Sequence, residues 1–204
     1  MIFAFNTMVF TYLFQTSILC IIFAFFGAIY QDKWFILFLL SFLFIPILIY
    51  LYREKIELPF INVKYVSPSD GIVKKIIYNG EKIDIYIDSN FLSSYTKRSP
   101  IDGTVTSIVK IGDSVILEIT SIDKTSIILE IKIKNKFTKG IIMEVNLNDI
   151  VKKGDRLCFV EFGSLIKFSI PNNVQLLIAV KSELIAGTMS IANLNNTINI
   201  NNII

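Results

Sequence analysis

Histidine is absent from this sequence of 204 residues, and only two cysteines are present. Without histidine, the chain cannot form a Ser-His-Asp triad, a Cys-His dyad or a histidine-based zinc site. Cys20 and Cys158 form no C-x-x-C motif, so the sequence predicts neither a metal centre nor a disulfide framework, and we expect both thiols to be packing residues. Any chemistry therefore depends on the remaining polar side chains or on a cofactor.

Charge is equally scarce at the N-terminus, where the first charged residue is Asp32. Two uncharged runs, Met8–Tyr30 and Trp34–Tyr52, are separated by the polar pair Asp32-Lys33. At about 1.5 Å per residue the first run extends roughly 35 Å, which exceeds a hydrocarbon core of about 30 Å. A cleavable signal peptide would need a basic residue before its apolar run, and Lys33 is the first basic residue. The sequence thus predicts an α-helical membrane hairpin over residues 1–52.

The distribution of basic residues predicts the side of the membrane on which the rest of the chain lies. Arg53 and Lys55 directly follow the second apolar run, whereas the break between the runs holds one acidic and one basic residue. By the positive-inside rule, we expect the following domain on the cytoplasmic face of the inner cell membrane. The net charge of +3 is too small to indicate a nucleic-acid partner.

The chain after a predicted linker, residues 53–59, is expected to be mainly β. Residues 60–192 alternate short runs rich in Ile and Val with turns of Gly, Asp, Asn and Pro, which is typical of a compact β-sandwich or barrel. Segment 67–73 recurs as segment 99–105, and these Asp-Gly turns resemble those of lipoyl- and biotinyl-like domains, although the carrier lysine of such domains is missing. Residues 193–204 form an Asn- and Ile-rich tail of low complexity.

A later stretch, Val151–Pro171, places a Gly-Ser pair between two apolar runs, Leu157–Phe162 and Leu165–Ile170. An isolated glycine in a strand commonly marks a bulge or a close approach of backbone, so Gly163 has an ordinary structural explanation. A glycine before a serine also leaves the peptide carbonyl open to attack by the serine hydroxyl. The pair Gly163-Ser164 is therefore also a candidate for a bond that the protein cuts in itself, although the tripeptide alone favours the structural explanation.

Four motifs occur in an order that resembles the phosphatidylserine decarboxylases, and they look most like the short bacterial form with an N-terminal membrane hairpin. The motifs are SPSDG at 67–71, RSPIDGTV at 98–105, VKKGDR at 151–156 and FGS at 162–164. This resemblance implies a proenzyme of a pyruvoyl-dependent decarboxylase, because all four motifs carry residues of that family.

The resemblance implies a specific course of maturation. The hydroxyl of Ser164 attacks the carbonyl of Gly163, and elimination from the resulting ester leaves a pyruvoyl cofactor in place of Ser164. The implied products are a β-chain of residues 1–163 and an α-chain of residues 164–204, which stay partners. The implied substrate is membrane phosphatidylserine, which is converted into phosphatidylethanolamine and CO2. A homo-oligomer is compatible with the resemblance but is not implied by it.

Three further site residues follow from the resemblance, each beside a plainer alternative. Asp70 matches an aspartate that assists self-cleavage as a base or orienting group, or it is a turn residue that bonds local backbone. Tyr95 falls where the family has a histidine proposed to donate a proton, and a phenol with a pKa of about 10 can donate a proton but is a poor base at neutral pH. Arg98 is retained and could hold phosphate or carboxylate, or it is a surface residue.

Two other functions remain open at this point. The missing histidine and the shortened segment Lys110–Lys124 also fit a catalytically degenerate homologue that acts as a membrane-tethered binding or scaffold module. A membrane-fusion-type adaptor with lipoyl-like halves is a third function, but such proteins normally carry a coiled coil, and this chain shows no heptads.

Overall fold

The computed structural model describes residues 14–18, 20–22, 24, 63–91, 93–134 and 140–194, and the chain divides into two compact units, Met1–Ile56 and Glu57–Ile204. The few described residues of the first unit are helical. Within the described part of the chain, no helix has the length and apolar character needed to cross a bilayer. The predicted hairpin over 1–52 and the predicted linker lie almost wholly outside the described residues, so the hairpin gains no support here and both stay predictions.

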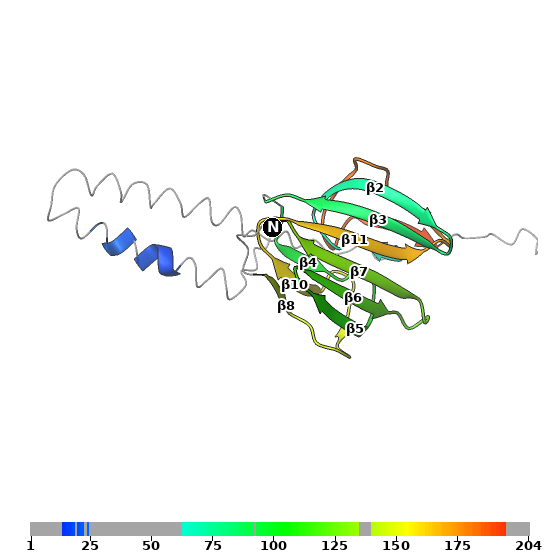
Figure 1. Cartoon of the computed structure of the whole chain (residues 1–204), viewed down its shortest axis with the longest axis horizontal. Helices are drawn as coiled ribbons and strands as arrows, with labels where there is room; N and C mark the ends of the chain where they lie inside the picture. The colour runs from blue at the N-terminus through cyan, green and yellow to red at the C-terminus, as the bar shows by residue number, and fades with distance from the viewer. Residues whose placement is uncertain are drawn as a thin grey trace, which may run out of the picture. The chain divides into compact units, whose positions relative to one another are not determined.

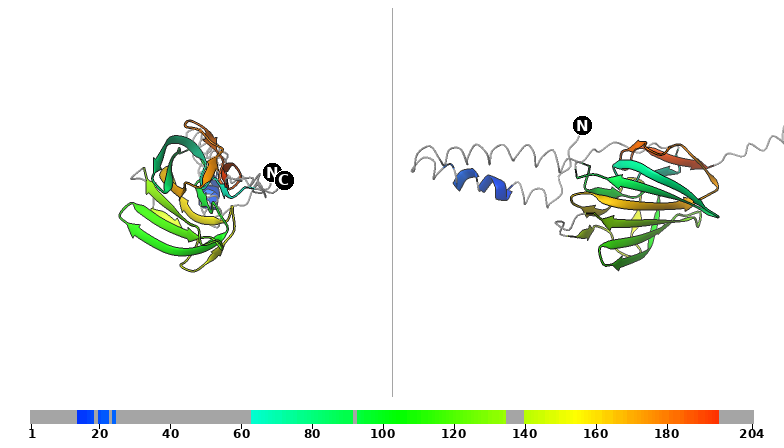
Figure 2. Two further views of the ribbon diagram at one scale, coloured as in Figure 1. Left: turned by 90° about the vertical axis from the view of Figure 1, so that its right-hand side faces the viewer. Right: turned by 45° about the horizontal axis from the view of Figure 1, so that its top comes forward.

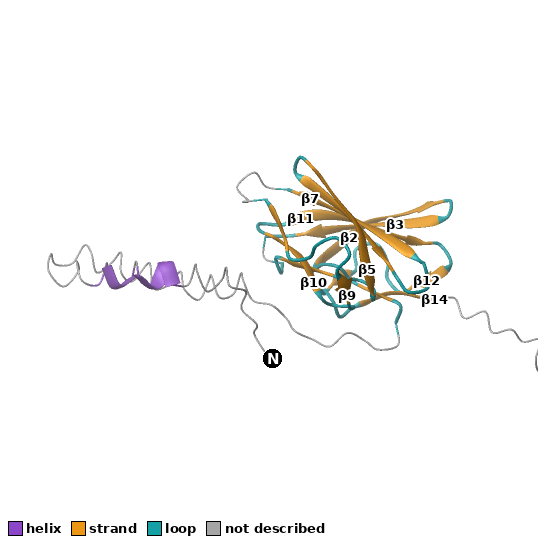
Figure 3. Cartoon of the chain, turned by 90° about the horizontal axis from the view of Figure 1, so that it is seen from below, coloured by secondary structure: helices purple, strands orange, loops and turns teal. Residues whose placement is uncertain are grey.

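The described residues of the second unit are built from β-strands, so the predicted mainly β class is confirmed (Figures 1 and 3). The strands are β1 (Tyr65–Val66), β2 (Gly71–Asn79), β3 (Lys82–Ser89), β4 (Thr96–Arg98), β5 (Gly103–Ile111), β6 (Ser114–Thr120), β7 (Ser126–Ile133), β8 (Ile141–Met143), β9 (Ile150–Val151), β10 (Arg156–Val160), β11 (Ser164–Pro171), β12 (Val174–Leu176), β13 (Glu183–Leu184) and β14 (Ser190–Leu194). They form an eight-stranded sheet of order β13-β2-β3-β11-β7-β6-β5-β9 and two three-stranded sheets, β1-β14-β12 and β4-β10-β8.

Alternation of apolar and polar residues explains why the large sheet forms. In β6, Val115, Leu117 and Ile119 are buried while the residues between them are partly exposed, and the same period of two recurs in β7 and β11. Burial of one such aliphatic side chain contributes about 1.5–3 kcal/mol to folding. The sheet curls around this apolar face like half a barrel, as the end-on view in Figure 2 shows.

The large sheet has an internal symmetry, because its strand order matches β2-β3 with β5-β6, β11 with β7, and β13 with β9. Gly71 and Gly103 begin β2 and β5. A Cβ atom on either would lie 2.5 Å from a carbonyl oxygen, that of Asp88 or of Thr120. The two segments that repeat in the sequence therefore adopt the same structure in two related halves.

The two Ser-Pro turns at the starts of these halves also bond each other reciprocally. The Val66 amide donates to the carbonyl of Pro100 at 3.0 Å, and the Arg98 amide donates to the carbonyl of Pro68 at 2.8 Å. Residues separated by 32 positions in the sequence thus exchange roles across the symmetry. A residue in one half can therefore be compared with the residue 32 positions away that holds the equivalent place in the other half.

Candidate functional site

The turn between β10 and β11 carries the Gly-Ser pair. Phe162 and Gly163 both have positive φ angles, 58° and 86°. A Cβ atom on Gly163 would lie 2.6 Å from the carbonyl oxygen of Ser89, so only glycine fits there. Sequence reasoning included Phe162 in an apolar run of β-favouring residues. The strand ends instead at Val160, because the chain must reverse over two left-handed residues to enter β11.

Ser164 is fully buried at the start of β11, and its Oγ atom has no hydrogen-bond partner. In the ladders of the large sheet it lies opposite Ser89 of β3 on one side and Ile133 of β7 on the other. A buried hydroxyl without a partner costs about 1–3 kcal/mol, so it needs an explanation other than stability. The arrangement leaves a buried hydroxyl without a partner on the residue that directly follows Gly163.

Lys97 lies close to this pair and is the principal feature that sequence reasoning missed. It is buried in β4, opposite Cys158 of β10. Its Nζ atom donates to Ser69 Oγ at 2.9 Å, to Ser89 Oγ at 3.2 Å and to the carbonyl of Ser94 at 3.2 Å. Burial lowers the pKa of Lys97 to about 8, against the smaller opposing effects of Cys158 and Asp70. The amine is therefore half neutral at about pH 8, well below the pH at which an exposed lysine loses its proton.

Asp70 holds together two distant segments of the same site. Its carboxylate accepts the amide of Ala186 at 2.7 Å and the amide of Ser94 at 3.2 Å. Asp102, its counterpart in the other half, accepts only one comparable amide among the described contacts, that of Lys153 at 2.8 Å. Asp70 thus bonds remote backbone rather than the local turn, and the bond to Ser94 distinguishes it from the turn residue Asp102.

Tyr95 lies beside the turn of the Gly-Ser pair. Its ring contacts Phe159 edge-on at a centroid distance of 5.8 Å and Phe162 at 6.0 Å. Burial, followed by the nearby charge of Glu161, raises the pKa of Tyr95 to about 12. The phenol therefore keeps its proton at neutral pH, which agrees with a donor and not with a base.

The side chain of Arg98 contacts the VKKGD turn and the segment around Gly187. Its guanidinium donates to the carbonyl of Gly154 at 2.6 Å, and its Cδ atom lies 2.8 Å from the place of a Cβ atom on Gly187. These contacts give it a packing role between the VKKGD turn and the last strands. Its binding of phosphate or carboxylate stays a prediction.

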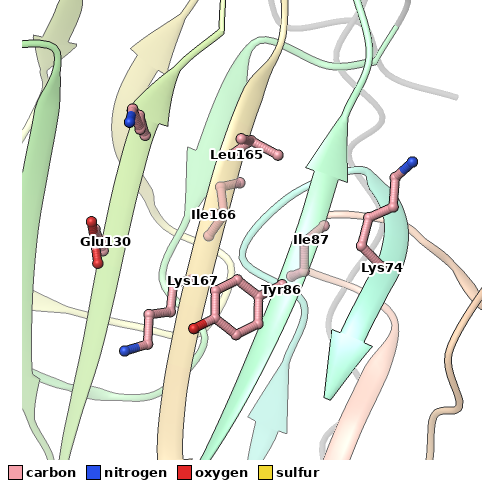
Figure 4. Close-up of a pocket in the computed structure, with 8 residues that line it drawn as sticks. Lys74, Tyr86, Ile87, Glu130, Leu165, Ile166 and Lys167 are labelled. Atoms are coloured by element: carbon pink, nitrogen blue, oxygen red, sulfur yellow. The ribbon is translucent and has the colours of Figure 1, made fainter. Parts of the chain in front are cut away.

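A cavity of about 340 Å³ lies on the outer face of the large sheet, opposite the face that carries Ser164 (Figure 4). Lys74, Tyr86, Glu130, Leu165 and Lys167 line it, from β2, β3, β7 and β11. Two of its lysines form ion pairs within the sheet, Lys74 with Asp88 and Lys167 with Asp84, so the face is mixed in charge. Across the described residues, no three acidic or cysteine side chains gather in a way that could hold a metal ion.

No family model matches the chain. The phosphatidylserine decarboxylase proenzyme of Wolbachia sp. subsp. Brugia malayi (strain TRS) is 28% identical over 156 residues, which is 64% of this chain and 67% of that protein. Proenzymes of the same name from Streptomyces avermitilis and Wolbachia pipientis wMel are 24% and 26% identical, over 63% and 64% of this chain and 66% and 67% of theirs. This chain is distantly similar to these proenzymes. It spans about two thirds of the length of each.

Among solved structures, the glucose permease IIA from Mycoplasma capricolum is similar to this chain at 18% identity with a TM-score of 0.44, over 64% of this chain and 94% of that one.

Proposed function

We propose that this chain is a phosphatidylserine decarboxylase proenzyme that cuts itself between Gly163 and Ser164 and then converts phosphatidylserine into phosphatidylethanolamine and CO2. The observation that carries the proposal is the buried, unpartnered Oγ atom of Ser164 next to a glycine in a left-handed turn. The names of three distant relatives support the same reaction.

The cut is a rearrangement that needs no outside reactant until its last step. Ser164 Oγ adds to the carbonyl carbon of Gly163, the C–N bond breaks, and the Oγ proton moves to the freed nitrogen, which gives an ester. Loss of the Cα proton of Ser164 then expels the carboxylate of Gly163. The remaining enamine takes up water and releases ammonia, and a pyruvoyl group begins the new chain.

The residues around the cut fit a group made from Ser164. The side chain lies on the inner face of the sheet, and β11 holds it between β3 and β7. A pyruvoyl group supplies a ketone that engages the substrate amine and withdraws electrons from the bond to the departing carboxylate. Tyr95, which keeps its proton at neutral pH, is the proposed proton donor to the carbon left behind.

A lipid substrate requires an apolar approach to the site. Phe91, Phe162 and Leu165 are exposed, and the amide nitrogen of Phe91 lies 3.4 Å from the place of a Cβ atom on Gly163. Exposed aromatic residues beside a cut site are the kind of surface that contacts the interface of a bilayer. This rim supports a site that meets a bilayer surface. The cytoplasmic face, and residues 1–52 as the anchor, are proposed from the charge pattern of the sequence.

The mass of the purified full-length chain tests self-cleavage. We expect two pieces, 1–163 and 164–204, of which the second begins with a pyruvoyl group, and we expect Ser164→Ala to yield one intact, folded chain. Folded wild-type protein that stays as a single uncut chain would contradict the proposal.

Formation of phosphatidylethanolamine from phosphatidylserine vesicles tests the second reaction. We expect activity that borohydride abolishes, because borohydride reduces the pyruvoyl ketone. The alternative function, a degenerate binding or scaffold module, is favoured by the lack of any histidine in the sequence. Cut protein without decarboxylation would support that alternative.

A further inference from the structure

The environment of Lys97 is unusual for a lysine. Among the described lysines it is the one whose side chain is buried, and its three hydrogen-bond partners are neutral oxygens. Burial of an ammonium without a bonded carboxylate costs several kcal/mol, because the group loses its hydration by water. Natural proteins keep such groups mainly where they carry out chemistry, so the position calls for a role other than stability.

The geometry connects the Lys97 amine to Ser164 through one hydroxyl. Ser89 Oγ accepts a hydrogen bond from Lys97 Nζ at 3.2 Å, and Ser89 lies directly opposite Ser164 in the β3–β11 ladder. Residues opposite each other in an antiparallel pair have Cβ atoms about 4.5–5.5 Å apart on the same face of the sheet. Ser89 is therefore bonded to the amine and opposed in the ladder to Ser164, whose hydroxyl has no partner.

The other half of the fold shows that its architecture does not require a lysine here. Tyr65 pairs with β14 as Lys97 pairs with β10, and Tyr65 is fully buried with its ring 6.4 Å from that of Phe168. The counterpart of Ser69 in that half, 32 positions later, is the buried core residue Ile101. An apolar pair thus fills the place that Lys97 and Ser69 occupy beside Ser164.

We propose that Lys97 is the proton acceptor that activates Ser164 for self-cleavage, with the hydroxyl of Ser89 relaying the proton. This inference rests on the proposed self-cleavage at Gly163-Ser164. The Ser164 Oγ proton passes to Ser89 while the Ser89 proton passes to Lys97 Nζ. The same proton returns along this path to the nitrogen of Ser164 as the C–N bond breaks, so the step consumes and releases no proton.

Other groups near the site are less suited to accept this proton. The Asp70 carboxylate is bonded to two backbone amides, and the Tyr95 phenol keeps its proton. Burial lowers the pKa of Lys97 to about 8, so a neutral amine is available near physiological pH. A Ser-Lys pairing without histidine is an established way to activate a serine.

The test measures the rate of self-cleavage of the full-length chain after refolding. Lys97→Met should slow it by roughly 10²–10⁴-fold, the usual contribution of a positioned base. Lys97→Arg keeps the positive charge but cannot deprotonate at these pH values, so it should slow cleavage as severely. Ser89→Ala should also slow cleavage, whereas Ser121→Ala, at the position 32 residues after Ser89 in the other half of the fold, serves as the matched control and should cleave within a few-fold of wild type.

A pH profile separates proton transfer from a merely structural role. The wild-type rate should rise as pH increases through about 8, the pKa of Lys97, and the residual cleavage of Lys97→Met should lose that rise. The charged or titratable groups that face the amine are Asp70 and Cys158, with Glu144 beside Cys158. Circular dichroism and thermal unfolding check that each variant folds.

The outcomes distinguish this inference from the proposed function. Folded wild-type chain that stays uncut overturns both. Wild-type cleavage together with equal rates and an unchanged pH profile in folded Lys97→Met overturns the role of Lys97 and leaves self-cleavage intact. Loss of cleavage and of the pH profile in folded Lys97→Met supports it.

Discussion

Gly163 and Ser89 come so close that a Cβ atom on Gly163 would lie 2.6 Å from the carbonyl oxygen of Ser89. That carbonyl belongs to the last residue of β3, which pairs with β11, so it cannot withdraw without disturbing the ladder. The contact holds Gly163, the residue before the proposed cut, against a rigid strand end, and the first prediction follows from it.

Gly163→Ala should destabilise the fold and slow self-cleavage. The left-handed backbone alone costs about 1–2 kcal/mol for a residue with a side chain, and the contact with Ser89 adds to this cost. The matched control is Gly80→Ala, because Gly80 has a φ of 57° but no atom within 4 Å of its Cβ position. Denaturant unfolding in a Ser164→Ala background measures the free energy of unfolding of both variants. An equal loss of this free energy in the two would contradict the importance of the contact.

Ser164→Ala should stop cleavage without loss of stability. Its Oγ atom has no partner, so its removal takes away a buried, unsatisfied hydroxyl and should leave the free energy of unfolding unchanged or raise it by about 1 kcal/mol. Ser169→Ala on the same strand is the control, because Ser169 Oγ donates to the buried Asp84 at 2.6 Å. The effect of Ser164→Ala is measured in a Lys97→Met background, in which cleavage is slow enough to leave the parent chain uncut, and the effect of Ser169→Ala is measured in a Ser164→Ala background. A marked destabilisation by Ser164→Ala alone would mean that its hydroxyl has a structural role.

Asp70→Ala should impair self-cleavage far more than Asp102→Ala. Asp70 accepts two partly buried backbone amides and the exposed Asp102 accepts one, so Asp70→Ala should lower stability by about 1–3 kcal/mol and Asp102→Ala by less. Only Asp70 also bonds Ser94, whose carbonyl accepts from Lys97 Nζ. Cleavage rates measured at matched stability test this difference, and similar rates in the two variants would assign Asp70 a structural role alone.

The stability effect of Lys97 should depend on pH in a defined direction. Its folded-state pKa is about 8 against an ordinary value of 10.5, so between these values the unfolded chain binds more protons than the folded one. Stability contributed at this position therefore rises with pH across that window, and the cost of the buried amine is greatest below about pH 8.

The measurement compares Lys97→Met with its parent, both in a Ser164→Ala background. The advantage in unfolding free energy of the methionine chain should shrink as pH rises from about 8 to 10.5. Titration of Tyr65 and Tyr95 is common to both chains and cancels in the difference. If the difference in unfolding free energy stays constant across this range, Lys97 does not lose its proton more readily in the folded chain than in the unfolded one.

Local sequence patterns were sufficient to predict the β class. They were not sufficient to predict which strands pair with each other. The period-two runs of β6 and β7 and the repeated Ser-Pro-x-Asp-Gly turns are encoded within a few residues, so they could be read directly. The buried place of Lys97 depends on β4 pairing with β10, which brings together residues about 60 positions apart (Lys97 with Cys158). Lysine side chains are usually exposed, and the residues next to Lys97 in the sequence do not indicate that it is buried.

The Gly-Ser pair shows the same division between local and long-range information. An isolated glycine in a strand indicates a bulge or a close approach of backbone, and a close approach to Ser89 is present. The turn that ends β10 before Phe162 was not predicted. The apposition of Ser164 to Ser89 follows from the register of β11 on β3, which is set by the packing of the entire sheet. The polar cluster beside the cut therefore could be described only once the register was known.

The central position of β11 determines how the protein can be assembled. The strand is paired with β3 along its full length and with β7 over most of it, yet the proposed cut frees its first residue from the preceding chain. Before the cut, β11 finds its place as part of one molecule; afterwards its return would be a second-order encounter that depends on concentration. Mature protein that has been denatured and diluted should therefore recover poorly, whereas the uncut Ser164→Ala chain should refold. In such a molecule the folded state is reached once, through the precursor, and is afterwards kept by slow unfolding.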